Sequence, residues 1–93
     1  MSNSWYVYIL TNYTNTVLYI GVTNNLERRL KEHRRYKGDS FVKRYRLYKL
    51  VWVEEFCSPS QAIEIEKKIK GWIREKKLNL IRQKNPYMKN LLV

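Results

Sequence analysis

Apolar residues at the start of the chain fall into two short runs separated by a polar stretch. The runs are Trp5–Leu10 and Val17–Val22, and Thr11–Thr16 lies between them. Both runs are rich in β-branched and aromatic residues and are too short and too closely spaced for helices of ordinary length. The pattern therefore predicts a β-hairpin with a looped connection.

A first helix is expected over about residues 25–36. Residues 23–25 supply N-cap candidates, and Asn24 with Glu27 three positions later resembles a capping box. On a helical wheel, Arg29 and His33 flank the apolar stripe of this helix. Arg28 falls on the opposite side, so we expect it to face water.

The middle of the chain predicts a helix break and a third strand. Residues 37–40 end the first helix, and residues 43–46 form a basic, aromatic connection. Residues 48–56 contain an apolar run typical of a strand.

The remaining sequence predicts a second helix and a stop. Ser58-Pro59 supplies an N-cap and a first helical position, so the helix begins at residue 59 and is expected to run to about Lys77 with Gly71 inside it. Asn85-Pro86 predicts a helix stop. A short C-terminal turn or helix is then expected to dock Leu91-Leu92.

One acidic residue, Glu66, falls within the apolar stripe of the second helix, whereas Glu64 and Glu75 fall on the opposite face. An ionised carboxylate among aliphatic side chains is costly unless a cation or hydrogen bonds satisfy it. Two explanations stay open. The first is an ion pair with Lys70 or Arg29. The second is Mg²⁺, which keeps most of its waters and takes further ligands from substrate phosphates, an arrangement suited to phosphodiester hydrolysis.

Composition narrows the class of protein. The 93 residues predict one domain, residues 1–93. Nineteen Lys and Arg against eight Asp and Glu give a net charge of +11, which points to a polyanionic partner, while 44% hydrophobic residues exclude a disordered basic tail. Cys57 and His33 are the only residues of their types, which excludes a disulfide framework and a Cys/His zinc site. No signal-like start and no apolar run of about 18 residues occurs, so we expect a cytoplasmic protein without membrane contact.

Several ordered motifs resemble the GIY-YIG nuclease family. Trp5–Leu10, Leu18–Thr23 and Asn25–His33 resemble the start of its catalytic domain, and Glu66–Trp72 resembles its compact, single-domain bacterial subfamily. The first motif departs from the family pattern, since Gly-Ile-Tyr reads Tyr6-Val7-Tyr8 here. The resemblance implies an α+β fold with a small three-stranded, mainly antiparallel sheet flanked by helices, and the activity of a metal-dependent endonuclease.

The resemblance also implies a set of catalytic residues. Tyr8 and Tyr19 border the active site from adjacent strands, Arg29 is the catalytic arginine, and Glu66 is the metal ligand for Mg²⁺, with Mn²⁺ as a substitute. His33 matches a histidine found in some branches of the family. Arg29 would donate to non-bridging phosphate oxygens, and Tyr19, the preferred candidate of the two tyrosines, would orient and deprotonate water.

Many family members carry a substrate-holding asparagine after the second helix. Asn79 and Asn85 both compete for that place.

The substrate expected from the sequence is DNA, with single-stranded or branched forms favoured because basic and aromatic residues interleave. The protein is expected to act as a monomer or weak dimer. A catalytically inactive or RNA-directed nucleic-acid-binding module on the same fold is the alternative function. The candidate nucleic-acid-binding residues are Lys31, Arg35, Lys43, Arg44, Arg46, Lys70 and Arg74.

Overall fold

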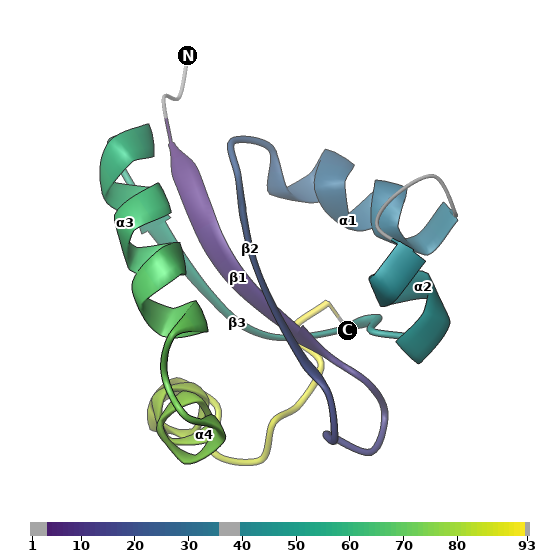
Figure 1. The fold of residues 1–93 in the computed structure, drawn as a ribbon. Helices are drawn as coiled ribbons and strands as arrows, with labels where there is room; N and C mark the ends of the chain where they lie inside the picture. The colour runs from purple at the N-terminus through teal and green to yellow at the C-terminus, as the bar shows by residue number, and fades with distance from the viewer. Residues whose placement is uncertain (1–3, 36–39, 93) are drawn as a thin grey trace.

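A three-stranded sheet with helices on both faces forms the protein (Figure 1). The computed structural model describes residues 4–35 and 40–92, and of residues 34, 35 and 40 it describes the backbone alone. The strands lie in the order β2-β1-β3, and both pairs are antiparallel, which confirms the predicted α+β fold. The elements are β1 (Trp5–Thr11), β2 (Leu18–Thr23), α1 (Leu26–Arg35), α2 (Ser40–Tyr45), β3 (Lys49–Phe56), α3 (Pro59–Lys70) and α4 (Arg74–Lys84).

The predicted hairpin and third strand are present. β1 pairs with β2 from Tyr6 opposite Thr23 to Thr11 opposite Leu18. The Asn12 side chain closes the connecting loop, because its Oδ1 accepts hydrogen bonds from two backbone N–H groups further along that loop, at 2.8 and 3.2 Å. This is the local capping behaviour that favours asparagine in turns.

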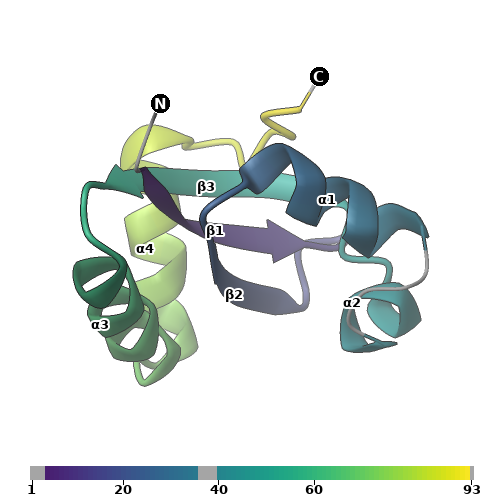
Figure 2. The same cartoon turned by 90° about the horizontal axis from the view of Figure 1, so that it is seen from above.

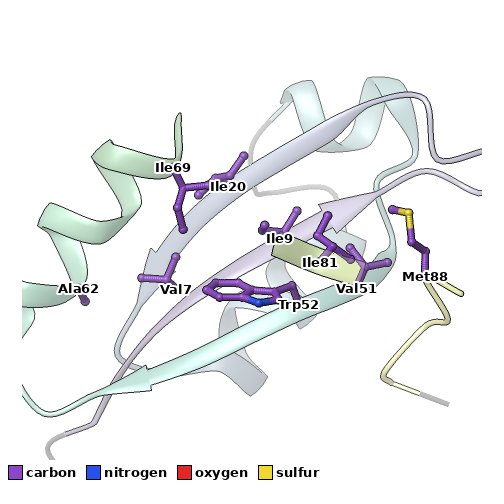
Figure 3. Close-up of a cluster of buried hydrophobic side chains, with 9 residues drawn as sticks. All are labelled: Val7, Ile9, Ile20, Val51, Trp52, Ala62, Ile69, Ile81 and Met88. Carbon is purple, nitrogen blue, oxygen red and sulfur yellow. The ribbon is translucent and has the colours of Figure 1, made fainter. Parts of the chain in front are cut away.

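The central strand β1 supplies both cores, since alternate residues of a strand point to opposite faces. Val7 and Ile9 point toward α3 and α4, where they pack in a cluster that includes Trp52 and Ile69 (Figure 3). The intervening Tyr8 and Leu10 point to the other face and pack in a second cluster with residues of α1 and the α2 region. Figure 2 shows α1 and α2 on one side of the sheet and α3 on the other.

The cap of α1 is Asn25, one of the three predicted candidates, and not Asn24, with which the capping box was expected. Asn25 is the capping residue, because its Oδ1 accepts the N–H of Arg28 at 3.0 Å and its carbonyl accepts the N–H of Arg29. Thr23 fixes this asparagine by accepting the Asn25 N–H at 3.1 Å. Asn24, the expected cap, is exposed. The predicted break over residues 37–40 lies mostly outside the described residues.

The basic connection expected over residues 43–46 is wrong, since most of it belongs to the six-residue helix α2. A helix this short contains too few residues to show the periodic spacing of apolar positions that predicts a helix. Its stability depends on tertiary packing. Val42 and Leu47 are fully buried, and the Leu47 N–H donates to the Val42 carbonyl at 3.0 Å. Arg46 ends the helix with a φ of 55°.

The long second helix is also wrong, because α3 ends at Lys70 and a separate helix, α4, starts at Arg74. Gly71 is the C-cap of α3, and its N–H donates to carbonyls of the last turn. Ile73, which lies between the two helices, is 74% exposed. The start of α3 is as predicted, with the Ser58 hydroxyl accepting the Gln61 N–H.

The predicted stop at Asn85 is confirmed, but the C-terminal segment does not dock through its leucines. Leu91 and Leu92 are 48% and 41% exposed. The segment is held instead by Met88, which is buried in the main hydrophobic cluster (Figure 3), and by polar contacts to β3. The Leu91 N–H donates to the Leu50 carbonyl, and the Asn90 side chain accepts the Leu50 N–H.

Among the described residues, no helix has the length and apolar character needed to cross a membrane.

Candidate active site

Tyr8 is the buried centre of the candidate site, and Gly21 makes room for it. The two residues are cross-strand partners on β1 and β2. A Cβ at Gly21 would lie 2.4 Å from Tyr8 Cζ and 2.5 Å from its hydroxyl oxygen, which no real structure tolerates. The glycine therefore lets the Tyr8 ring lie flat over β2, so its hydroxyl is directed toward the β2 edge of the sheet.

Tyr8, Tyr19 and His33 form one aromatic cluster on this face. A hydrogen bond of 2.9 Å joins the Tyr8 hydroxyl and His33 Nε2. The Tyr19 ring lies edge-on to the His33 ring with centroids 5.6 Å apart, and 6.3 Å from the Tyr8 ring. Tyr8 and His33 are buried, whereas Tyr19 is half-buried. Of the two tyrosines, Tyr19 is therefore the more accessible to a substrate.

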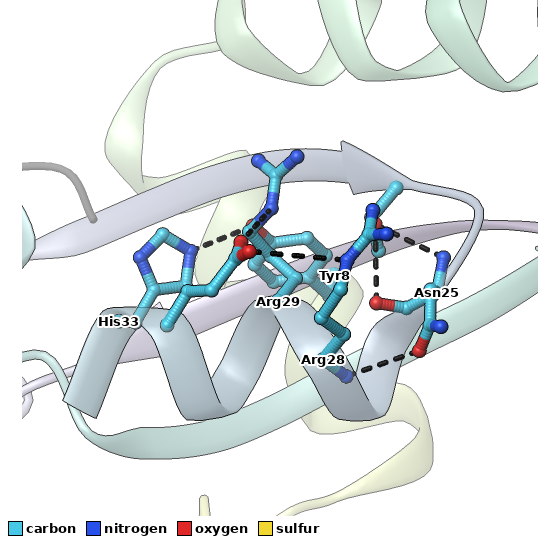
Figure 4. Close-up of polar contacts among 7 residues, drawn as sticks. Tyr8, Asn25, Arg28, Arg29 and His33 are labelled. Atoms are coloured by element: carbon cyan, nitrogen blue, oxygen red, sulfur yellow. Dashed lines mark hydrogen bonds and ion pairs between the residues drawn. The ribbon is translucent and has the colours of Figure 1, made fainter. Parts of the chain in front are cut away.

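Arg29 lies one turn before His33 on α1, beside the same cluster. Its Nε lies 3.4 Å from a Glu32 carboxylate oxygen (Figure 4). Arg28 reaches the same carboxylate from the outer side at 3.8 Å. The side chain of Arg29 is 36% exposed against 58% for Arg28. The predicted helical phase is thus confirmed, with Arg29 at the buried boundary and Arg28 in water.

Glu66 lies in the buried face of α3, as its position in the apolar stripe predicts. It is 6% exposed and is the one buried acidic residue in the described part of the chain, whereas Glu64 and Glu75 are exposed. Lys70 Nζ lies 2.5 Å from Glu66 Oε2, so the ion pair with Lys70, one of the two expected explanations, is formed. The alternative pairing with Arg29 is not.

The candidate residues lie on opposite faces of the edge strand β2. Tyr8, Tyr19, Arg29 and His33 belong to the face covered by α1, whereas α3, which carries Glu66, packs against β1 and β2 from the other face. Figures 1 and 2 both show α1 and α3 on the two sides of the sheet with β2 at its edge. The structure therefore joins Tyr8, Tyr19 and His33 directly. Arg29 lies one turn before His33 on the same helix, and Glu66 lies on the other side of β2.

The described part of the sequence matches a known catalytic family. Residues 4–79 match the GIY-YIG catalytic domain. The chain belongs to the GIY-YIG family. Family members are generally endonucleases, so this GIY-YIG domain is a nuclease domain, and its excess of basic residues suits the nucleic acid that such a domain binds.

Relatives cover nearly the whole GIY-YIG domain. A UPF0213 protein of Staphylococcus haemolyticus is 39% identical over 79 residues, covering 85% of this chain and 95% of the relative. A UPF0213 protein of Oceanobacillus iheyensis is 38% identical over 81 residues, covering 87% and 93%. The solution NMR structure of a UPF0213 protein from Bacillus halodurans superposes with a TM-score of 0.61 at 31% identity, covering 94% of this chain and 92% of that one.

The predicted nucleic-acid-binding residues do not form one patch on a single element. Lys31 pairs with Glu27 at 3.2 Å, and Arg74 donates to the Asn15 carbonyl at 2.6 Å, which ties α4 to the hairpin loop. Lys70 is the partner of Glu66 described above. Lys43, Arg44 and Arg46 are exposed on and just after α2. The side chain of Arg35 lies outside the described part of the structure.

The two candidate asparagines have different surroundings. Asn85 is buried, and its side chain makes hydrogen bonds of 2.8–3.0 Å to Val51 and Lys89 backbone atoms. These contacts hold the C-terminal segment against β3. Asn79 is exposed on α4. Of the pair, only Asn79 therefore has a side chain open to a ligand.

Sequence analysis missed Phe41 of α2. Its ring centroid lies 6.4 Å from that of Tyr19, and the residue is 42% exposed. The only signal for it in the sequence is a phenylalanine next to a basic run. Its place beside Tyr19 follows from the position of α2, which the sequence does not predict.

Proposed function

We propose that this GIY-YIG domain is a Mg²⁺-dependent endonuclease that hydrolyses phosphodiester bonds in single-stranded or branched DNA, with Mn²⁺ as a substitute. The observation that supports it most directly is the buried carboxylate of Glu66 on a helix that packs against the edge strand of the tyrosine cluster.

The ion pair with Lys70 does not account for the position of Glu66. A Glu–Lys ion pair between helix positions i and i+4 on an exposed surface stabilises the helix by only about 0.2–0.5 kcal/mol. The Lys70 side chain is 57% exposed. Burying a carboxylate costs more than that. Glu64 shows that a solvated face was available on the same helix. The burial of Glu66 therefore supports a ligand-binding role over a purely structural one.

The donor set fits Mg²⁺. In the part of the chain that the structure describes, no three His, Cys, Asp or Glu side chains gather into a ligand cage. A single buried carboxylate with hard oxygen donors is how proteins commonly hold Mg²⁺, which keeps its waters and binds substrate phosphates. When bound through Glu66, the cation would neutralise charge at the phosphate and at the leaving oxygen.

The side chains of the tyrosine cluster would perform the remaining steps. Arg29 donates to the non-bridging oxygens as charge develops on the phosphate. Tyr19, half-buried at the edge strand, would orient the attacking water and, as the phenolate left after its own proton has passed to solvent, accept the proton of that water. Tyr8 and His33 are buried and bonded to each other, so we assign them a positioning role behind Tyr19 and Arg29.

The decisive experiment compares wild type with Glu66→Ala and the matched control Glu64→Ala. Labelled single-stranded, duplex and forked DNA and single-stranded RNA are incubated with Mg²⁺, Mn²⁺ or a chelator. We expect wild type and Glu64→Ala to cut single-stranded and forked DNA with either metal. We expect Glu66→Ala to lose at least about 100-fold in cleavage rate, with unchanged melting temperature and DNA affinity.

Other outcomes contradict specific parts of the proposal. Binding without cleavage by wild type would indicate a binding module, and cleavage of RNA alone would indicate an RNA-directed enzyme. Full cleavage by Glu66→Ala would reject the metal ligand. If the Lys70 pair is the whole role of Glu66, Lys70→Ala and Glu66→Ala will lose equal stability and cut equally well.

A further inference from the structure

The aromatic cluster of the candidate site continues onto the surface through α2. The Phe41 ring lies 6.4 Å from the Tyr19 ring with an interplanar angle of 32°, and the Tyr45 ring lies 4.8 Å from Phe41. Phe41 and Tyr45 are 42% and 39% exposed. A row of three rings thus runs from the half-buried tyrosine on β2 to solvent.

The exposure of these rings is built into the fold. Val42, between them in sequence, is fully buried, and Leu47 is fully buried just after the helix. These two residues anchor α2 on the sheet, and Phe41 and Tyr45, four positions apart, lie together on a neighbouring side of the helix that is partly open to solvent. Val42 and Leu47 thus belong to the core, whereas the Phe41 ring is partly open to solvent.

The surroundings of the rings are cationic. Residues 40–49 contain four basic and no acidic residues. The Arg44 guanidinium carbon lies 5.5 Å from the centroid of the Tyr45 ring, and Lys43 and Arg46 are exposed beside it. Exposed rings combined with a basic surface are the means by which proteins hold single-stranded nucleic acid, because the bases stack and the backbone is neutralised.

We propose that Phe41 and Tyr45 stack an unpaired base of the DNA strand whose phosphate is cut beside Tyr19. This inference rests on the proposed function and deepens it, since it assigns the preference for unpaired DNA to particular side chains. In an intact duplex both faces of a base are covered by its neighbours, so no face is free for these rings.

The test measures DNA affinity in the Glu66→Ala background, so that binding is read without cleavage. The probes are single-stranded DNA oligonucleotides, each with one abasic site, the site moving one nucleotide at a time along the strand. We expect one position at which loss of the base weakens binding about tenfold. Phe41→Leu, which keeps an apolar side chain but removes the aromatic face, should weaken binding of intact DNA by a similar factor.

The two losses should not add. On the DNA lacking the critical base, Phe41→Leu should cause no further loss, because the stacking partner is already gone. Phe41→Trp should restore affinity for intact DNA. Tyr13→Leu is the matched control, since Tyr13 is 92% exposed in the hairpin loop, and it should leave affinity unchanged. Melting curves verify the fold, and Tyr45→Leu repeats the test if Phe41→Leu is unstable.

Three results would overturn the stacking site. The first is that the losses from Phe41→Leu and from the missing base add, and the second is that Tyr13→Leu weakens binding as much as Phe41→Leu. The third is that Phe41→Leu changes the oligomeric state of the protein but not its affinity for DNA. The last result would indicate contact between copies of the chain. These failures are separable from failure of the nuclease proposal. If the wild type cuts DNA but the effects of Phe41→Leu and the abasic site are additive, only the stacking site is rejected. If the two effects are not additive but the wild type does not cut DNA, only the nuclease activity is rejected.

Discussion

At the scale of single residues, the lack of a side chain at Gly21 allows the Tyr8 ring to lie against β2. The space that a Cβ would occupy is filled by the end of the Tyr8 ring. Because Tyr8 is fully buried and bonded to His33, the ring has no free volume into which it could move. A glycine within a strand is otherwise unfavourable, so its presence here follows from this close approach.

The first prediction compares substitutions of the two described glycines. Gly21→Ala should lower the free energy of unfolding by about 1–3 kcal/mol through overpacking and should lower the cleavage rate by displacing Tyr8. Gly71→Ala should be neutral or stabilise by about 0.4–1 kcal/mol, because Gly71 has a φ of −79° and the nearest atom that a Cβ would meet, the Lys68 carbonyl oxygen, is 3.5 Å away. Urea unfolding and cleavage assays measure both, and equal destabilisation would contradict the geometry at Gly21.

The second prediction separates Arg29 from its neighbour. Both Arg28 and Arg29 lie near the Glu32 carboxylate, so removal of either should change stability by less than about 1 kcal/mol. Arg29 is the less exposed of the two, at 36% against 58%, and lies one turn before His33 of the aromatic cluster. Arg29→Ala should therefore reduce kcat/KM for DNA by about 100-fold or more, while Arg28→Ala leaves it nearly intact. Similar losses in steady-state assays would reject the assigned roles.

At the scale of elements, the C-terminal segment is fixed to β3 through the residue that ends α4. Asn85 donates to the Val51 carbonyl on β3 and to the Lys89 carbonyl, and it accepts the Lys89 N–H. One buried side chain thus satisfies groups on a strand and on the tail. Together with the buried Met88, this side chain holds the tail against the sheet without burying Leu91 or Leu92.

The third prediction contrasts the two asparagines. Asn85→Ala should destabilise the protein by about 2–3 kcal/mol, because buried backbone groups lose their partners. Asn79→Ala should leave the melting temperature unchanged, since Asn79 is exposed on α4. If Asn79 holds the substrate, its replacement raises KM for DNA at unchanged stability. An unchanged KM, measured beside the melting curve, would remove Asn79 from the site.

At the scale of the whole molecule, the net charge of +11 sets how the protein meets DNA. Binding of a polyanion releases condensed cations, so affinity falls steeply with salt. The basic residues of α2 lie beside the site, whereas Lys84 is paired with Glu54 of β3 at 3.0 Å. β3 is the edge of the sheet opposite β2.

The fourth prediction concerns that salt dependence. The logarithm of the affinity for single-stranded DNA should fall linearly with the logarithm of salt concentration, and the double variant Lys43→Ala/Arg44→Ala should lower the slope by about 0.7 per lost phosphate contact. Lys84→Ala should leave the slope unchanged. Titrations by fluorescence anisotropy at several salt concentrations measure the slopes, and an equal effect of Lys84→Ala would indicate unspecific charge attraction.

The sequence predicted those elements that depend on the pattern of residues close together in the chain. The hairpin, the third strand and the start of α3 at Pro59 all follow from local alternation or capping chemistry. The misses have physical reasons. The helix α2 is too short to show a period, and the break at Gly71 depends on how α4 packs under the sheet, which residues 70–74 alone do not reveal.

By itself, the sequence determined the strands, the buried faces of α1 and α3, and the identity of Glu66 as a carboxylate in an apolar stripe, because each of these depends on periods of a few residues. Only the tertiary structure decided that Tyr8 lies over Gly21 and bonds His33, that Phe41 continues the row of rings, and that Glu66 pairs with Lys70 on the far side of β2. Except for that intrahelical pair, these contacts join residues distant in the chain, so strand register and helix placement had to form before they could exist.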